Sequence, residues 1–233
     1  MHSPKGTSKY GLILSKASYI CLVLVCASLP FAILLNSYLI IITIASCIFY
    51  SLVNGVEKRD GNKYYSLLII MYLLNLVAFF TSQNLKPVFT DLEQKLSLLA
   101  FPIIFLLGPK LNDKKIRILM ITFVCSVAIV SLLSFRNGFY WGYHNEVLLY
   151  DNLLVRHPYL GMYCVLCFFF CLEIISETKA RHIRLLFITL AIFFVFFLIV
   201  LFAKMSLVTF PILVFLYLLF NLYYNQKKNL VYS

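Results

Sequence analysis

Eight long apolar runs, nearly free of charged side chains, constrain the fold of this chain more than any other feature. They lie at residues 17–35, 37–53, 64–80, 92–107, 116–135, 159–176, 185–203 and 206–224. The hydrocarbon core of a bilayer is roughly 30 Å thick and takes about 20 helical residues to cross, so most of these runs can span it. They lack the alternating pattern of an outer-membrane strand, and a single segment in lipid satisfies its own backbone only as a helix. The sequence therefore predicts an all-α fold, a polytopic integral membrane bundle of about eight transmembrane helices.

The amino-acid composition agrees with a membrane protein and argues against a nucleic-acid-binding one. Of the 233 residues, 62% are hydrophobic and 12% are charged, which is more apolar surface than a soluble core of this length can hide. The net charge of +11 is divided among short basic clusters between the apolar runs. Such clusters face the anionic headgroups of membrane lipids. We therefore expect membrane lipids, and no nucleic acid, as partners of the chain.

The seven cysteines all fall inside apolar runs, which indicates buried thiols rather than a disulfide framework. Cys164 and Cys167 have the spacing of half a zinc or redox motif, but no second pair or nearby ligand accompanies them in the sequence. The histidines and acidic residues also lack the spacing of a metal site. The sequence predicts no metal and no cofactor.

The distribution of lysine and arginine predicts which side of the membrane each loop faces. Most of the 20 basic residues fall in the segments 5–16, 58–63, 110–117, 179–184 and 227–228. Because positive charge accumulates in cytoplasmic segments, both termini are predicted to be cytoplasmic and residues 136–158 to form an outward-facing loop. The run at 92–107 is the weakest span, since its uncharged part is short and contains Pro102. Without this span the basic loops no longer alternate between the two sides of the membrane, so we keep it as a span. The sequence predicts a single transmembrane domain, residues 1–233.

Residues at the ends of the runs agree with this direction. Thr90 followed by Glu93 predicts a capping box at the start of the fourth helix. Pro158 suits the first position of the sixth helix, and Ser206 is a candidate cap for the eighth.

Polar chemistry gathers at the predicted outer ends of the sixth and eighth helices. Both helices run from outside to inside, so their positive dipole ends and unpaired N–H groups point outward. Arg156, Lys204 and Arg136 lie in or beside these ends, and we expect them to converge on a phosphate or pyrophosphate. His157, or else His144, is the candidate general base, because a histidine beside an arginine at a helix mouth suits proton transfer.

A simpler interpretation of the same residues stays open. Basic residues at helix ends often only reach the lipid phosphates, and the aromatic side chains Tyr140, Trp141, Tyr143, Tyr150 and Tyr159 have the composition of an interfacial belt. Away from their ends the apolar runs carry no ionisable Asp, Glu, Lys, Arg or His, apart from Glu173 near the inner end of the sixth run and Lys204 at the outer end of the seventh. An ion-coupled transporter usually needs such a residue near the middle of the membrane, so that class of transporter is disfavoured.

Four stretches in order resemble the O-antigen ligase/polymerase family of bacterial envelope glycosyltransferases. They are LPFAILLNSYLIIITIASCIFYSLVNG at 29–55, LEQKLSLLAFPIIF at 92–105, RHPYLGMY at 156–163 and AKMSLVTFPILVFL at 203–216. The resemblance implies a multi-pass protein of the bacterial inner membrane, with a glycan on undecaprenyl pyrophosphate as its donor. The acceptor is then lipid A-core or a growing glycan, and no metal is needed.

The resemblance also implies roles for single residues. Arg156 and His157 match the step before the sixth helix, where family arginines hold the pyrophosphate and a histidine serves as base, and Lys204 matches a basic position near a serine. Family members continue beyond this point with further helices, so the chain is expected to be the N-terminal part of a longer fold. A lipid-linked saccharide transporter or flippase, and an inactive truncated membrane scaffold, are the two other hypotheses.

Overall fold

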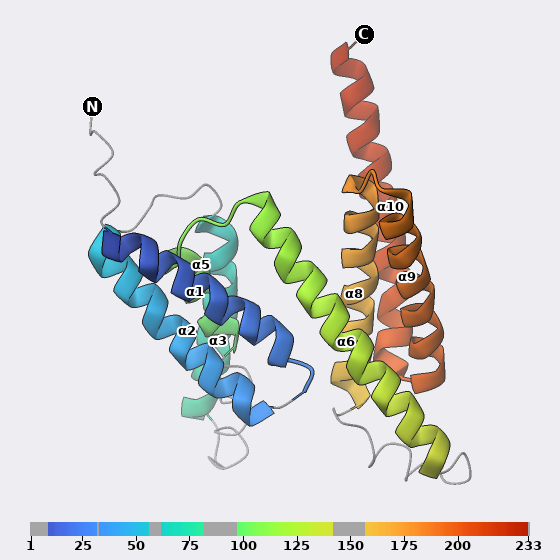
Figure 1. The fold of residues 1–233 in the computed structure, drawn as a ribbon, viewed down its shortest axis with the longest axis horizontal. Coiled ribbons are helices and arrows are strands. Elements are labelled where there is room, and N and C mark those ends of the chain that lie inside the picture. Colours follow the sequence, from blue (N-terminus) through green and yellow to red (C-terminus); the bar gives the residue numbers. More distant parts are fainter. Residues whose placement is uncertain (1–8, 32, 56–61, 82–96, 142–156, 233) are drawn as a thin grey trace. The chain divides into compact units, whose positions relative to one another are not determined.

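The computed structural model describes residues 9–31, 33–55, 62–81, 97–141 and 157–232 of the chain. These residues are almost entirely helical (Figure 1), with the elements α1 (Lys9–Ser28), α2 (Ile33–Asn54), α3 (Asn62–Thr81), α5 (Ser97–Leu107), α6 (Asp113–Trp141), α8 (His157–Glu177), α9 (Arg181–Leu201) and α10 (Lys204–Tyr232). Six of them, α1, α2, α6, α8, α9 and α10, are long and apolar enough to cross a membrane. The predicted all-α, multi-pass membrane fold is confirmed.

Two of the eight predicted spans are not tested by the described residues. The apolar part of α3 with described side chains is Tyr65–Val77, which is shorter than a span. Helix α5 has 11 residues, about 17 Å at 1.5 Å per residue. Its predicted extension, with the capping box of Thr90 and Glu93, lies outside the described residues. Spanning by these two segments stays a prediction.

The surface of the helices suits a hydrocarbon solvent. Large apolar side chains point outward, such as Val208 and Phe215 on α10, which are 62% and 61% exposed. Hydroxyl groups on the same exposed surfaces are already paired: Thr189 Oγ1 donates to the carbonyl of Leu185 at 3.0 Å, and Thr209 Oγ1 to that of Met205 at 2.7 Å. Because each hydroxyl bonds one turn back along its own helix, neither exposes an unpaired donor to lipid.

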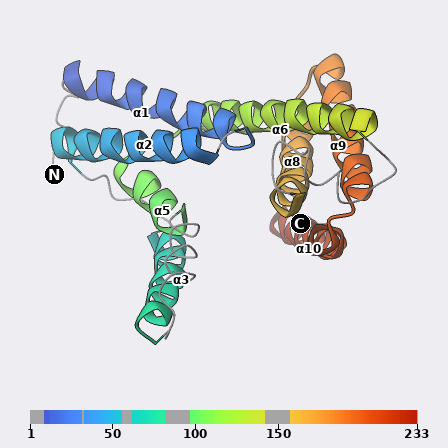
Figure 2. The ribbon, with the colours of Figure 1, turned by 90° about the horizontal axis from the view of Figure 1, so that it is seen from below.

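The contacts group the chain into two compact units, Met1–Ser28 with Ile33–Ile116, and Leu29–Ala32 with Arg117–Ser233. In the first unit α1 and α2 run side by side in opposite directions (Figure 2). Ser46 Oγ donates across this pair to Ser18 Oγ at 3.1 Å. Helix α5 contacts both α2 and α3. The single domain of 1–233 stays a prediction.

The first helix begins and ends earlier than predicted. The sequence predicts a span at 17–35, whereas α1 is Lys9–Ser28 and a turn at 29–31 leads to α2. The turn follows from Pro30, which lacks an N–H and disfavours helical geometry in the residue before it. At the other end, Lys16 is exposed within the helix, where its long apolar stem covers the surface while the charge reaches the interface. An apolar run therefore located the helix but not its limits.

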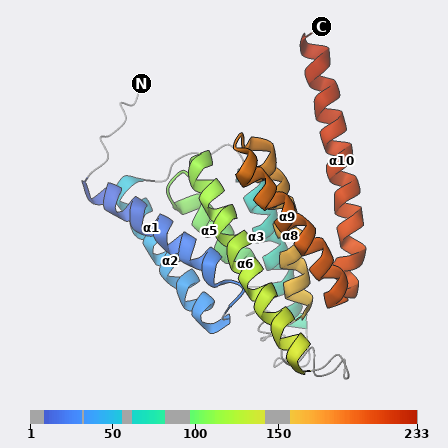
Figure 3. The ribbon, with the colours of Figure 1, turned by 45° about the vertical axis from the view of Figure 1, so that its right-hand side comes forward.

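In the second unit, α8 and α9 form an antiparallel pair, and α10 lies alongside (Figure 3). The rings of Phe168 and Phe210 meet edge to face with centroids 5.0 Å apart, and Phe169 meets Tyr217 at 5.7 Å. Since residue numbers rise together along both helices in these contacts, α8 and α10 are parallel. Both therefore begin at the same end of the unit, as the sequence predicts.

The side of the membrane that each end faces can be tested by labelling single cysteines. In a background without the seven native cysteines, Gly142→Cys should react with an impermeant thiol reagent from outside, and Asn62→Cys should not. Reaction of both sites after the membrane is permeabilised is the control for accessibility. Labelling of Asn62→Cys alone in intact cells would reverse the predicted topology and move every candidate site residue to the cytoplasmic side.

Candidate functional site

The first turns of α8 and α10 touch at a cluster of small residues. A Cβ added at Gly161 would lie 2.6 Å from Ser206 Oγ and 2.8 Å from Ala203 Cβ, so the two helices approach as closely as glycine permits. Ala203 and Ser206 are 2% and 3% exposed. Small residues let transmembrane helices come together closely, and packing and hydrogen bonds then stabilise the contact. Gly161 thus fixes the distance between two parallel helix starts.

A tight turn between α9 and α10 places the start of α10 here. Phe202 takes a left-handed conformation, with φ 49°, and its N–H donates to the carbonyl of Ile199 at 3.1 Å. The carbonyl of Ala203 then accepts the N–H of Leu207 at 2.9 Å, which makes Ala203 the residue that precedes the helix. The sequence prediction that Ser206 caps this helix is therefore wrong. Ser206 lies inside the first turn and packs on Gly161 instead.

The arrangement concentrates positive potential at one end of the second unit. Helices α8 and α10 each leave the N–H groups of their first turn without an intrahelical partner, and their dipoles are positive at this end. Lys204 is the first residue of α10, and its side chain is exposed. His157 is the first residue of α8, and its side chain lies outside what the structure describes. Parallel helix starts with an exposed ammonium suit an anion such as phosphate.

Helix α6 brings a third polar group to the same end. It runs antiparallel to α8, because Phe123 meets Phe170 and Ser131 Oγ lies 3.8 Å from Cys164 Sγ, one turn inside Gly161. Ser134, the next small residue along α6, is 2% exposed, and its Oγ has no hydrogen-bond partner among the described residues. A buried hydroxyl without a partner costs free energy.

Arg136 lies in a helix and not in the predicted loop of 136–158. Helix α6 continues to Trp141, and α8 already begins at His157, so the loop is shorter at both ends. Helix α6 can continue to Trp141 because Arg136–Trp141 contains no proline and only a single glycine. Arg136 is exposed and follows Ser134 by two residues, on the end of α6 that meets the start of α8.

The remaining candidate residues, Arg156 and His144, lie outside the described residues. Of the five predicted site residues, the structure therefore brings Lys204, Arg136 and the backbone of His157 to one end of one unit. No pairing of a histidine with a carboxylate can be assigned within that set.

Sequence reasoning missed the packing role of the small residues that assemble this end. Gly161, Ala203, Ser206, Ser131 and Ser134 carry no charge and look like ordinary members of apolar runs. Their signal is spacing: Gly161 and Cys164, and likewise Ser131 and Ser134, are three residues apart and share a helix face. Small residues repeated on one face of a membrane helix indicate a close helix contact.

Comparison of the chain with protein-family models, with curated proteins and with solved structures finds no match.

Proposed function

We propose that the chain is a membrane glycosyltransferase of the O-antigen ligase/polymerase type, acting in the bacterial inner membrane. Its donor is a glycan on undecaprenyl pyrophosphate, and its acceptor is lipid A-core or a growing glycan at the periplasmic face. The observation that supports this proposal is the meeting of the parallel starts of α8 and α10 at Gly161, with Lys204 exposed beside them. An anion site of this kind at a membrane surface fits a lipid-linked pyrophosphate.

In the proposed reaction the anomeric carbon of the donor glycan exchanges its bond to a pyrophosphate oxygen for a bond to the acceptor oxygen. The bond from the anomeric carbon to the pyrophosphate breaks, and the bonding electron pair leaves with the lipid pyrophosphate. The acceptor hydroxyl attacks from the opposite face and gives its proton to His157, or else to His144. Arg156, Lys204 and Arg136 stabilise the charge that grows on the leaving pyrophosphate. The steps balance without an oxidant, and the residues named supply all the acid–base chemistry.

The proposal is tested with the purified chain in detergent, a polyprenyl-pyrophosphate glycan and an acceptor. Formation of a new glycosidic bond, followed by mass spectrometry of the product, supports the transferase. If reconstituted vesicles move the glycan across the bilayer without forming a bond, the chain is a transporter. If protein that binds the donor forms no product and moves no glycan, the inactive scaffold is the remaining hypothesis.

Replacing Lys204 tests the part of the site that the structure describes. Lys204→Ala should weaken donor binding about tenfold, the size of one charge-assisted hydrogen bond to phosphate. The measurement is a titration of the detergent-solubilised protein with the donor. Lys110→Ala, which removes an exposed lysine from the first unit, should leave binding unchanged. Equal loss in the two variants would indicate a general effect of charge and exclude Lys204 from the site.

A further inference from the structure

Two arginines from different helices converge at the opposite end of α8. Thr178, just after the last residue of α8, is 4% exposed. Its Oγ1 accepts a hydrogen bond from Arg117 Nη2 of α6, and its carbonyl accepts one from Arg184 Nη2 of α9 at 3.0 Å. Thr178 Oγ1 itself donates to the carbonyl of Ile174 at 2.6 Å. One threonine therefore holds two guanidinium groups close together.

Neither guanidinium has a carboxylate partner in the described part of the chain. Glu173 and Glu177 on α8 are exposed, and no ion pair joins them to Arg117 or Arg184. Two like charges placed together repel each other, more strongly at a membrane interface than in water. A bound anion between them relieves that repulsion, and guanidinium groups match phosphate oxygens in a two-pronged contact.

The start of α9 adds to the same positive field. Its N-cap residue, Ala180, provides no side-chain hydrogen bond to the first turn. The first N–H groups of α9 are therefore left for another acceptor. Lys179 and Arg181, on either side of Ala180, are both exposed. The cationic end thus combines the pair of guanidinium groups with an uncapped helix start.

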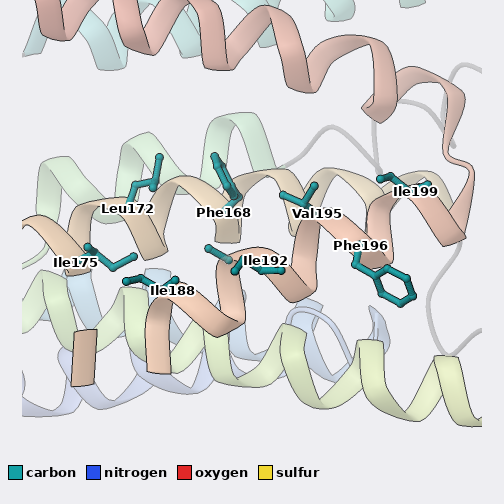
Figure 4. A pocket seen from close by; sticks show the side chains of 9 residues that line it. Phe168, Leu172, Ile175, Ile188, Ile192, Val195, Phe196 and Ile199 are labelled. Atoms are coloured by element: carbon teal, nitrogen blue, oxygen red, sulfur yellow. The ribbon is translucent and has the colours of Figure 1, made fainter. Parts of the chain in front are cut away.

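An apolar groove begins one helical turn from this pair of arginines. It holds about 420 Å³ between α8 and α9, and Figure 4 shows the side chains from both helices that line it. The lining residues are Phe168, Leu172, Ile175, Ile188, Ala191, Ile192, Val195, Phe196 and Ile199. Ile188 is four residues after Arg184, and Ile175 is three residues before Thr178. The groove therefore continues from the arginine pair along the surface of two membrane-spanning helices.

We propose that this end of the second unit binds one anionic phospholipid. Its phosphodiester lies between Arg117 and Arg184, and one of its acyl chains lies in the groove of α8 and α9. The groove is lined only by hydrocarbon side chains and runs along helices long enough to cross a bilayer, so its occupant at that depth is a lipid chain. The cations at its end select a negative headgroup. Since neither arginine belongs to the proposed glycosyltransferase site, this inference stands or falls separately.

Native mass spectrometry of the purified chain in a neutral detergent tests the proposal. Phosphatidylglycerol and phosphatidylcholine with identical acyl chains are titrated in parallel, and the fraction of protein carrying one lipid is measured. The wild type should prefer phosphatidylglycerol. Arg117→Gln and Arg184→Gln should each lower its affinity for that lipid about fivefold, and the double variant should bind both lipids alike. Arg117→Lys, which retains the positive charge, should keep part of the preference.

Matched variants distinguish binding of the lipid headgroup from binding of the acyl chain. Lys110→Gln removes an exposed cation of the first unit and should leave the preference intact. Ile192→Trp fills the groove and should weaken phosphatidylglycerol binding, whereas Leu186→Trp, at a position of similar exposure outside the groove (57% against 65%), should not. Equal binding of the two lipids by the wild type overturns the proposal. So does competition by inorganic phosphate together with no effect of Ile192→Trp, since that result assigns the arginines to free phosphate.

Discussion

Replacing Arg156 with alanine should abolish product formation in the transfer assay and weaken binding of the donor. The proposed role of Arg156 is to stabilise the charge that develops on the leaving pyrophosphate, and removing one such donor typically costs about 100-fold to 1,000-fold in rate. Arg156→Lys should restore activity only in part, because the charge remains but the planar two-pronged contact to phosphate oxygens is lost. Turnover and donor binding are measured separately on purified protein.

Replacing the neighbouring His157 should give a different kinetic result. As a general base it acts on the acceptor, so His157→Ala should lower turnover by about 100-fold or more while leaving donor binding nearly unchanged. His182→Ala is the matched control, because His182 also lies in the first turn of a helix, α9, and is exposed. It should be silent.

If Arg156 and His157 only anchor α8 at the lipid interface, the opposite pattern is expected at both positions. Lysine would then substitute well for Arg156, and His157→Ala would be close to silent. The abundance of each variant in the membrane has to be measured as well, since a misinserted α8 would imitate loss of function. Normal activity of both alanine variants at normal abundance would shift the search to Arg136, His144 and Lys204.

Enlarging Gly161 should have the second-largest effect. In Gly161→Leu the new side chain meets Ser206 and Ala203, whose nearest atoms are already 2.6 and 2.8 Å from a bare Cβ. Overpacking of this kind costs about 1–3 kcal/mol. Because the contact holds the starts of α8 and α10 together, donor binding should fall with stability. Thermal unfolding in detergent and a donor titration measure the two effects.

A second substitution at the partner residue distinguishes a local clash from general damage. Ser206→Gly removes two of the three atoms nearest to the added Cβ, namely Oγ and Cβ of Ser206. The smaller substitution Gly161→Ala adds only the Cβ and should also lower stability. In the double variant Gly161→Ala/Ser206→Gly, part of that stability should be recovered, and a double-mutant cycle gives the interaction energy. Met162→Leu, at the next and 63% exposed position, is the control and should be neutral. Strictly additive effects of Gly161→Ala and Ser206→Gly would show that the two residues do not contact each other.

The sequence predicted the helices well, because a segment in lipid has few other ways to pair its backbone. Helix limits were less predictable. Lys16 lies inside α1, and Arg136 lies inside α6, since long cationic side chains reach the interface from within a helix. A hydropathy scale scores these charged residues as strongly polar, so the predicted apolar run stops beside them although the helix continues. Pro30 was the better marker, as the turn between α1 and α2 forms around it.

The candidate site could be predicted only in its charged part. Helix direction predicted that α8 and α10 begin at the same end, and the structure places Gly161 of α8 against Ser206 of α10. The roles of the charged residues at that end stay predictions. Close approach at Gly161 depends on which faces meet, and that is a property of packing that no single helix sequence determines. The arginine pair at Thr178 was missed for the same reason, since Arg117 and Arg184 are 67 positions apart and meet only when α6 and α9 both contact the end of α8.

The short turn between α9 and α10 has a consequence for how the chain is made. Only Phe202 and Ala203 separate the two helices, and two residues reach at most about 7 Å. Once α9 spans the bilayer, the first residue of α10 therefore lies at the same interface as the last residue of α9. We therefore expect the pair to enter the membrane as one helical hairpin with its tip leading. In the predicted topology that tip would carry the ammonium group of Lys204 across the hydrocarbon during synthesis, and lengthening the turn is expected to let the two helices insert one after the other.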